Sequence, residues 1–295
     1  MTATVLAVLG RGLVDPTSPI ARADDPGLTR GDGCFEGCRV QTAPDGTSTV
    51  DKLDAHLARM ARSAKALDIA FDPERWRGLV DDALAAWVAP GEAAMKLLLT
   101  RGPASAQPLG FAAIGPIPVD YPRLRHDGLK VITLDRGTGH DAFADAPWLL
   151  GGVKTLSYAV NMAAQREAAR RGADDAIFVS ADGQVLEAPT SSVVWSDGRT
   201  LFTTPSGPSG ILASTTLLLL FDRAEAADWP TAVSPVSVEE LHAAPVLWLL
   251  GSVRGPVDVV DLDGRARSRN PHIDDQVRRL AGFPTSAQSW QDSPD

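Results

Sequence analysis

The sequence predicts an α+β fold with two domains, built from mixed and mostly antiparallel strands. Three observations support this prediction. The chain has 295 residues, which is enough for one large or two medium domains. Its apolar, strand-like runs do not alternate with helices as they would in a regular βαβ array. A segment rich in Pro and Gly, "GPIPVDYPRLRHDG", separates the two halves of the chain.

The domain boundaries follow from that segment. We expect a small N-terminal α/β domain over residues 1–118, a linker over 119–128 and a larger C-terminal domain over 129–283. The last twelve letters, "PTSAQSWQDSPD", cover residues 284–295 and are polar. We expect this tail to be disordered, because it has little apolar surface to bury.

The first half contains strands and two helices. Strand-like runs are "TATVLAVLG", "GCRVQTA" and "STVDKL", and the tetrapeptide "PDGT" predicts a hairpin turn between the last two. Apolar residues at helical spacing predict a helix over 53–71. A second helix is expected over 72–88, with Asp72 as its N-cap and Pro73 in its first turn. Two further strands, "AAMKLLLTRG" and "LGFAAIGPI", follow.

The second half begins with the strand "LKVITLD" and continues into a helix over about 158–171. The stretch 174–205 alternates apolar runs with "ADG" and "SDG" turns, which predicts a ladder of hairpins. A Gly-rich loop then enters a helix within "GPSGILASTTLLLLFDRAEA". Two more strands are expected in "APVLWLLGSVRGPVDVVDLDG".

Composition excludes several classes of function. A net charge of −9 and a pI of about 5.0 argue against nucleic acid as the main partner, because phosphate binding needs a clustered basic surface. The start of the chain does not resemble a signal peptide, and "TLLLLF" is too short to span a bilayer. Cys34 and Cys38 are predicted to be buried thiols, since residues four apart on a strand are too distant for a disulfide. We therefore expect a cytoplasmic protein that does not bind membranes.

Common site motifs are missing from the sequence. "LGRGLVD" does not match G-x-G-x-x-G, no G-x-x-x-x-G-K-[ST] occurs, and "GPSGI" does not match G-x-S-x-G. The five histidines are dispersed, so no metal site is predicted.

One lysine stands out. The chain has five lysines, and none follows Lys154, which lies in the Gly-preceded loop "GGVKTLSYAVN". A pyridoxal phosphate enzyme needs a lysine for the Schiff base, a carboxylate near the pyridinium nitrogen, and an anion cradle for the phosphate. Lys154 and Glu187 are candidates for the first two, and "SGPSGILASTT" with Arg59 is a candidate for the third.

Together these motifs resemble the fold-type IV pyridoxal phosphate enzymes, which include branched-chain aminotransferases, D-amino acid aminotransferases and 4-amino-4-deoxychorismate lyases. The resemblance covers residues 5–280, and its motifs occur in the family's order: "RGDGCFEGCRV", "HLARMARSA", "LLLTRG", "VKTLSYAVNMAAQREAARRGADDAIFVSADGQVLEAPTSSVVW", "GILASTT" and "LWLLGS". It implies a two-domain fold like that of D-amino acid aminotransferase, with pyridoxal 5′-phosphate between the domains in a C-terminal cofactor-binding domain. It also implies a small-molecule substrate and a homodimer.

The resemblance also implies roles for individual residues. Lys154 would be the Schiff-base lysine and the proton shuttle, and Glu187 would pair with the pyridine nitrogen. The remaining cofactor contacts would come from Arg59, Thr215, Thr216 and Ser252 at the phosphate and from Leu212 at the ring. Two departures from the family stand out: "GILASTT" lacks the usual Pro-Gly and the following Arg, and Ser192 replaces a common Asn.

Finer features favour one member of the family. "GDGCF", and "KTLSY" with its 33-residue separation from Glu187, resemble the lyases. "TRGPASAQPLGF" lacks the Arg-x-His carboxylate trap of D-amino acid aminotransferases, and "KTLSY" lacks the Gly-Gly-Asn-Tyr of branched-chain enzymes. The sequence therefore predicts a lyase that converts 4-amino-4-deoxychorismate to 4-aminobenzoate and pyruvate for folate synthesis. Arg39 and Arg101 are candidates for binding the substrate carboxylates. The alternatives are an aminotransferase of branched-chain or D-amino acids that uses the same Lys154 and Glu187, and a non-catalytic relative.

Overall fold

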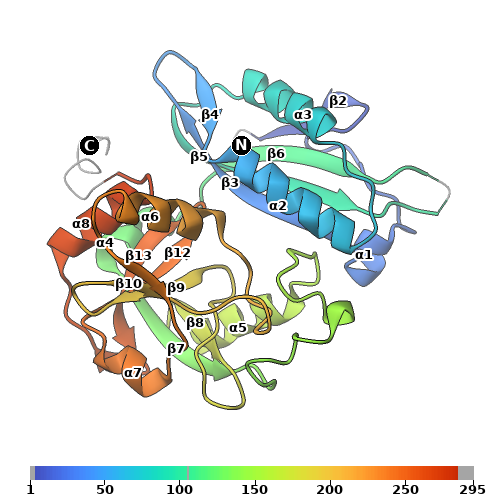
Figure 1. The fold of residues 1–295 in the computed structure, drawn as a ribbon. Helices are drawn as coiled ribbons and strands as arrows, with labels where there is room; N and C mark the ends of the chain where they lie inside the picture. Colours follow the sequence, from blue (N-terminus) through green and yellow to red (C-terminus); the bar gives the residue numbers. More distant parts are fainter. Residues whose placement is uncertain (1–3, 105, 285–295) are drawn as a thin grey trace. The chain divides into compact units, whose positions relative to one another are not determined.

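The computed structural model describes residues 4–104 and 106–284, which form two compact units. Unit 1 contains Met1–Val119 and Val153–Tyr158, and unit 2 contains Asp120–Gly152 and Ala159–Asp295 (Figure 1). Two features differ from the expected boundaries. The predicted linker contains a helix, α4 (Tyr121–Asp127), which belongs to unit 2. The segment around Lys154 belongs to unit 1, whereas its position in the sequence predicts the C-terminal domain. The predicted tail lies, from residue 285 onward, outside the described residues.

Unit 1 is built on an antiparallel sheet with the strand order β2-β1-β6-β5-β3-β4. Its strands are β1 (Val5–Val8), β2 (Gly12–Val14), β3 (Gly33–Thr42), β4 (Ser48–Val50), β5 (Gly91–Thr100) and β6 (Gly110–Pro116). A short helix, α1 (Pro26–Arg30), precedes β3. The turn predicted at "PDGT" joins β3 and β4, which confirms that hairpin.

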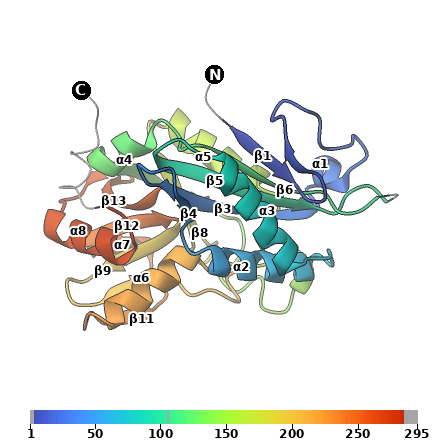
Figure 2. The same cartoon turned by 90° about the horizontal axis from the view of Figure 1, so that it is seen from above.

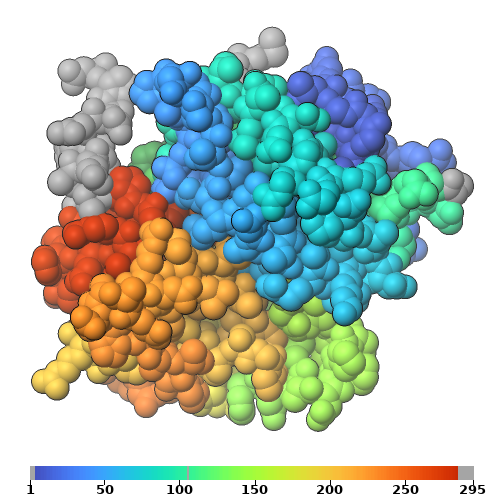
Figure 3. All heavy atoms as spheres, turned by 45° about the horizontal axis from the view of Figure 1, so that its top comes forward, coloured from blue at the N-terminus to red at the C-terminus, as the bar shows by residue number. Residues whose placement is uncertain are grey.

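Helices α2 (Leu53–Ala66) and α3 (Pro73–Ala86) cover one face of this sheet (Figures 1 and 2). Their apolar sides pack on Cys34 and Cys38 of β3, which are buried free thiols as predicted. Their other sides form part of the surface of unit 1 (Figure 3). The α2 helix ends five residues before its predicted end, because Asp68 has a φ of 53° and the Ile69 N–H closes onto Ala64 O.

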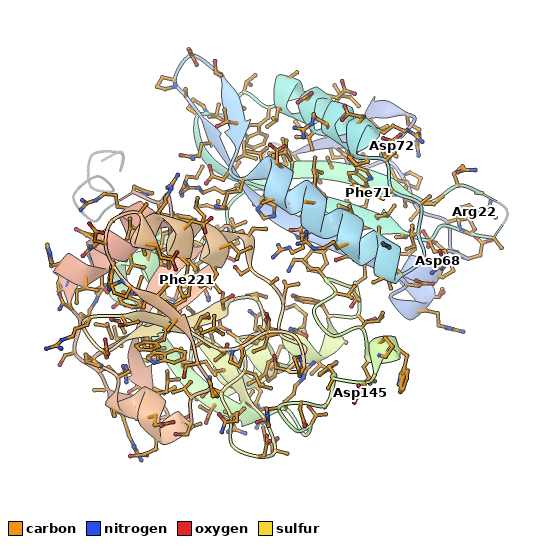
Figure 4. The ribbon with its side chains drawn as sticks, viewed as in Figure 1. Arg22, Asp68, Phe71, Asp72, Asp145 and Phe221 are labelled. Carbon is orange, nitrogen blue, oxygen red and sulfur yellow. The ribbon has the colours of Figure 1, made fainter. Side chains whose placement is uncertain are left out.

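The start of α3 was predicted from its capping residues, and the structure confirms it. The Asp72 side chain accepts hydrogen bonds from the N–H groups of Glu74 and Arg75. The preceding Phe71 stacks on Trp76 with ring centroids 5.7 Å apart. Figure 4 labels Phe71 and Asp72 at this turn between the two helices.

Unit 2 contains a mixed sheet with the strand order β11-β10-β9-β12-β13-β7-β8, and β14 pairs with β13. Its strands are β7 (Leu129–Asp135), β8 (Asp175–Val179), β9 (Ser192–Ser196), β10 (Leu201–Thr203), β11 (Thr231–Val233), β12 (Val246–Gly251), β13 (Gly255–Leu262) and β14 (Arg265–Ala266). The predicted hairpin ladder over 174–205 is only partly correct. β9 and β10 form a hairpin, but β8 pairs in parallel with β7 at the opposite end of the sheet.

The fully buried strand β12 divides the interior of unit 2 into two cores. Leu247 and Leu249 point into one core, whereas Trp248 and Leu250 point into the other, as strand alternation requires. The second core is covered by α6 (Thr215–Glu225) and α8 (Pro271–Leu280), which contact each other. The remaining helices are α5 (Ala159–Arg170), α7 (Val238–Ala243) and the short η1 (Pro147–Leu149). No helix in the described part of the chain has the length and apolar character needed to cross a membrane.

Candidate active site

The backbone of Lys154 is fixed against the edge of β3 in unit 1. The N–H of Phe35 donates to Lys154 O at 3.1 Å, and the N–H of Leu156 donates to Gly33 O at 2.8 Å. The N–H of Lys154 itself donates to Ser63 Oγ on α2 at 3.2 Å. These hydrogen bonds explain why the segment 153–158 packs with unit 1. They also hold the lysine at a defined position rather than on a free loop.

The side chain of Lys154 lies among aromatic rings. Its Nζ donates a hydrogen bond to Tyr158 Oη at 3.3 Å and lies 4.5 Å from the centroid of the Phe35 ring. Phe35 and Tyr158 pack edge to face with centroids 5.0 Å apart. The amine is therefore oriented by one hydroxyl and two ring faces. Tyr158 was not among the predicted site residues, although it is the last residue of "KTLSY" and lies four positions after the lysine.

Arg59 belongs to a buried charge cluster on α2 and β3. Its Nε and Nη2 donate to the two carboxylate oxygens of Glu36 at 2.7 and 2.6 Å, and His56 Nδ1 lies 2.8 Å from Glu36 Oε2. Glu36 and His56 are fully buried, and Arg59 is 4% exposed. Burial alone would raise the pKa of Glu36, but the hydrogen bonds from Arg59 and His56 outweigh it and lower that pKa to about 2. The same carboxylate raises the pKa of Arg59 despite its burial.

Glu36 was not predicted from the sequence. A signal for it exists, because Glu36 alternates with Cys34 and Cys38 on the core face of β3, where a charge needs a partner. The bidentate geometry fixes the rotation of the Arg59 guanidinium. Glu36 thereby orients two of the three guanidinium nitrogens of Arg59. Phosphate binding by Arg59 stays a prediction.

The two arginines predicted to bind substrate carboxylates both have partners within unit 1. Arg39 is 1% exposed and donates to Asp51 at 2.7 Å and to Glu92 at 2.8 Å. Arg101 donates to Asp32 and to the carbonyl oxygen of Leu67 at 2.6 Å. These contacts give both guanidinium groups a structural role, so the geometry adds no support for assigning them to the substrate.

Glu187 lies in unit 2, in the segment between β8 and β9. Its backbone O accepts the N–H of Phe178 at 2.9 Å, which joins this segment to β8. Its carboxylate Oε2 accepts the N–H of Leu212 at 3.3 Å. The structure therefore brings together Glu187 and Leu212, the two residues predicted to contact the cofactor ring.

The three hydroxyl groups predicted to bind phosphate also come together in unit 2. Ser252, which follows β12, has its Oγ 3.0 Å from Thr216 Oγ1 and 3.5 Å from Thr215 Oγ1. Thr215 and Thr216 occupy the first turn of α6, and Ser214 caps this helix by accepting the N–H of Leu217. Hydroxyl groups at the N-terminus of a helix favour an anion, because the helix dipole and unpaired N–H groups point toward it.

These residues fit pyridoxal phosphate chemically. Within unit 1 there is an oriented amine, and within unit 2, taken by itself, there are an oriented carboxylate and a hydroxyl cluster at a helix N-terminus. No group of His, Cys, Asp and Glu side chains suited to a metal ion occurs among the described residues.

Comparison with known proteins identifies the family. The family model described as amino-transferase class IV matches residues 33–262. The chain belongs to the class IV aminotransferases. Enzymes of this class use pyridoxal 5′-phosphate, which agrees with the residues described above. Lys154, Glu187 and the hydroxyl cluster all lie within the matched region.

Individual class IV relatives resemble the chain over nearly its whole length. A curated Mycobacterium tuberculosis protein named "Bifunctional aminodeoxychorismate lyase / D-amino acid transaminase" is 38% identical, over 90% of this chain and 94% of its own. A pyridoxal phosphate-bound structure of a hypothetical aminotransferase from M. tuberculosis has a TM-score of 0.89 and 36% identity, over 97% of this chain and 100% of that one. A fold IV-transaminase from Curtobacterium pusillum has a TM-score of 0.87 and 38% identity, over 95% and 99% of the two chains.

Proposed function

We propose that this class IV enzyme is a lyase that converts 4-amino-4-deoxychorismate to 4-aminobenzoate and pyruvate. The observation that carries its chemistry is the Lys154 amine, oriented by Tyr158 and Phe35. The choice of a lyase is supported by "GDGCF" and "KTLSY", and by the relative at 38% identity whose name includes that activity. The small substrate and its products suit an enzyme of the cytoplasm, and we propose that the protein acts as a homodimer.

When bound, pyridoxal 5′-phosphate supplies a ring that accepts electrons from the carbon atom next to the substrate amine. Lys154 Nζ would hold this cofactor at its aldehyde carbon, and it would be free as an amine once substrate is bound. The freed Nζ then removes the proton from C4 of the substrate as a general base. The bond between C3 of the ring and the enolpyruvyl oxygen then breaks, which makes the ring aromatic, and Nζ gives its proton to the methylene carbon of the departing enolpyruvate, which becomes pyruvate. Tyr158 Oη accepts a hydrogen bond from Nζ, and in this role it keeps the free amine oriented between the two transfers.

Glu187 keeps a proton on the pyridine nitrogen, which lets the ring accept charge. The Leu212 N–H holds the Glu187 carboxylate in orientation. Thr216 and Ser252 bind the phosphate through their hydroxyl groups, with Thr215 beside them. Arg59 contributes a positive charge to phosphate binding, with its guanidinium oriented by Glu36.

The test is to incubate the purified holoenzyme with 4-amino-4-deoxychorismate and to measure both products. We expect equal amounts of 4-aminobenzoate and pyruvate from the wild type and none from Lys154→Ala. Lys130→Ala is a matched control, because Lys130 is an exposed lysine on β7 and has no proposed role. Absence of both products from a wild type that holds its cofactor would overturn the lyase proposal.

A second candidate function is an aminotransferase of D-amino or branched-chain amino acids. The name of the 38% identical relative includes D-amino acid transaminase, which favours the former. Such an enzyme would lose the visible absorbance of its cofactor on mixing with the amino acid and regain it with a 2-oxo acid. A lyase that is not also an aminotransferase would show no such cycle with any D-amino or branched-chain amino acid.

A further inference from the structure

Arg136 in unit 2 has a guanidinium group that the fold does not neutralise. It follows β7 directly, and its Cζ lies 4.7 Å from the centroid of the Phe178 ring. Its Nη1 is buried and has no hydrogen-bond partner in the described part of the chain. A buried donor without a partner is costly, and the cost is higher for a charged group. This arrangement is what a binding site for an anion requires.

The nearby acids bind other groups. Asp135 Oδ1, on the preceding residue, accepts the N–H of Gly137 at 2.6 Å. The carboxylate of Asp182, just after β8, accepts the N–H of His140 at 3.1 Å and pairs with its ring Nδ1. The side chain of Arg136 therefore differs from those of Arg39 and Arg101, which each bind carboxylates of the protein itself.

The backbone around Arg136 is held in place. The N–H of Arg136 donates to Val179 O at 2.7 Å, and the N–H of Ala181 donates to Thr138 O at 2.8 Å. Together with the contacts between His140 and Asp182, these bonds fix the segment 136–140 to the end of β8. An anion site built on such a segment is preorganised, so little ordering of the chain opposes binding.

Phe178 links Arg136 to the cofactor-ring residues of unit 2. The N–H of Phe178 donates to Glu187 O, and its side chain packs in one cluster with Leu186 and Ile211. Ile211 directly precedes Leu212, whose N–H binds the Glu187 carboxylate. Arg136 thus lies on the aromatic ring that also supports the Glu187 segment. This position suits a group that binds substrate rather than the cofactor phosphate, whose proposed hydroxyl ligands are on α6 and after β12.

We propose that Arg136 binds a carboxylate of the substrate. The inference rests on the proposed function, because it assumes that Glu187 marks the place of the reaction. A guanidinium fork matches a planar carboxylate in a bidentate geometry, and stacking on Phe178 keeps the fork oriented.

The test uses pairs of small probes that differ by a carboxylate. The two carboxylates of 4-amino-4-deoxychorismate end in 4-aminobenzoate and in pyruvate, so these products are compared with aniline and acetone by calorimetric titration of the holoenzyme. In Arg136→Met we expect the dissociation constant of one carboxylate probe to rise about ten- to a hundred-fold, as for the loss of a charged hydrogen-bonded pair. Binding of aniline and acetone should not change.

Two further variants control the test. Arg136→Lys keeps the charge without the fork and should weaken the same probe less. Arg199→Met removes an exposed arginine after the Asp197 turn and should leave every dissociation constant unchanged. Wild-type affinity of Arg136→Met for both carboxylate probes would overturn the proposal. Failure of the lyase proposal would look different: the wild type would release no 4-aminobenzoate, while its affinity for one of the two carboxylate probes would still depend on Arg136.

Discussion

Replacing Glu36 with Gln should destabilise unit 1 strongly. Glu36 is fully buried and forms two hydrogen bonds with Arg59 and one with His56. Gln has nearly the same shape, but it cannot neutralise Arg59 and places an NH₂ group where a carboxylate oxygen was. Breaking a buried ion pair from one side costs about 3–5 kcal/mol, because the remaining charge stays buried without compensation.

The lowered pKa of Glu36 gives an independent value for this loss of stability. A decrease from 4.5 to about 2 corresponds to roughly 3 kcal/mol of preference for the ionised form in the folded state. Because the folded pKa is depressed, this stabilisation is fully present above the unfolded pKa of 4.5. It is lost as the pH falls from there toward the folded pKa of about 2. The wild type and Glu36→Gln should therefore differ most near neutral pH and converge in acid.

Amide hydrogen exchange of peptides from β3 and α2 is the suitable assay, because two compact units need not unfold in one transition. Glu92→Gln is the matched control, since Glu92 also pairs with a buried arginine in unit 1 but is partly exposed. We expect the control to lose only about 1 kcal/mol. A loss below about 1 kcal/mol in Glu36→Gln, or a loss that does not shrink in acid, would refute the reasoning.

Three further predictions concern the proposed site and unit 2. Lys154→Ala should abolish the visible absorbance of the reconstituted enzyme and lower product formation at least about 10³-fold; an unchanged spectrum would remove Lys154 from its proposed role. Ser252→Ala should weaken cofactor binding to the apoprotein about tenfold in a fluorescence titration, whereas Ser206→Ala, at an exposed position, should not. Burial and the nearby Asp258 raise the pKa of Asp274 from 3.8 to about 6, so the fold loses stability as the pH rises from 3.8 through about 6. Asp274→Asn, which keeps an acceptor for Trp248 Nε1, should therefore stabilise unit 2 by about 1–2 kcal/mol in urea unfolding at neutral pH but not in acid.

Much of the architecture could be predicted because it follows from local patterns. The α3 helix carries its own start signal in Asp72 and Pro73, and the buried strands of unit 2 appear as apolar runs. The position of β8 could not be predicted in this way. The turn after β8 resembles a hairpin turn, and Val179 does bridge Val185. The strand itself nevertheless pairs with β7, because the α5 crossover places β7 and β8 side by side in parallel.

The placement of Lys154 depends on contacts between distant parts of the chain. The family motifs predict its role, but not that its carbonyl oxygen accepts the N–H of Phe35 at the edge of β3. Ser63 on α2 adds a third segment to the same position. No local pattern encodes such a pairing, so chain order assigned the lysine to the second half. The aromatic environment of its amine was missed for the same reason.

The four arginines considered for anion binding differ in the partners of their guanidinium groups. The sequence predicts phosphate binding by Arg59 and substrate binding by Arg39 and Arg101, whereas no motif singles out Arg136. What separates them is the presence of a protein carboxylate within reach: Asp51 and Glu92 bind Arg39, Glu36 binds Arg59, and Asp32 binds Arg101. Arg136 has an aromatic ring beside it instead, and its Nη1 has no partner among the described residues. A guanidinium already paired with a carboxylate must give up that attraction or share it before it binds substrate. An unpaired one gains the full interaction, so the burial of Arg136 Nη1 favours this residue for recognising the substrate.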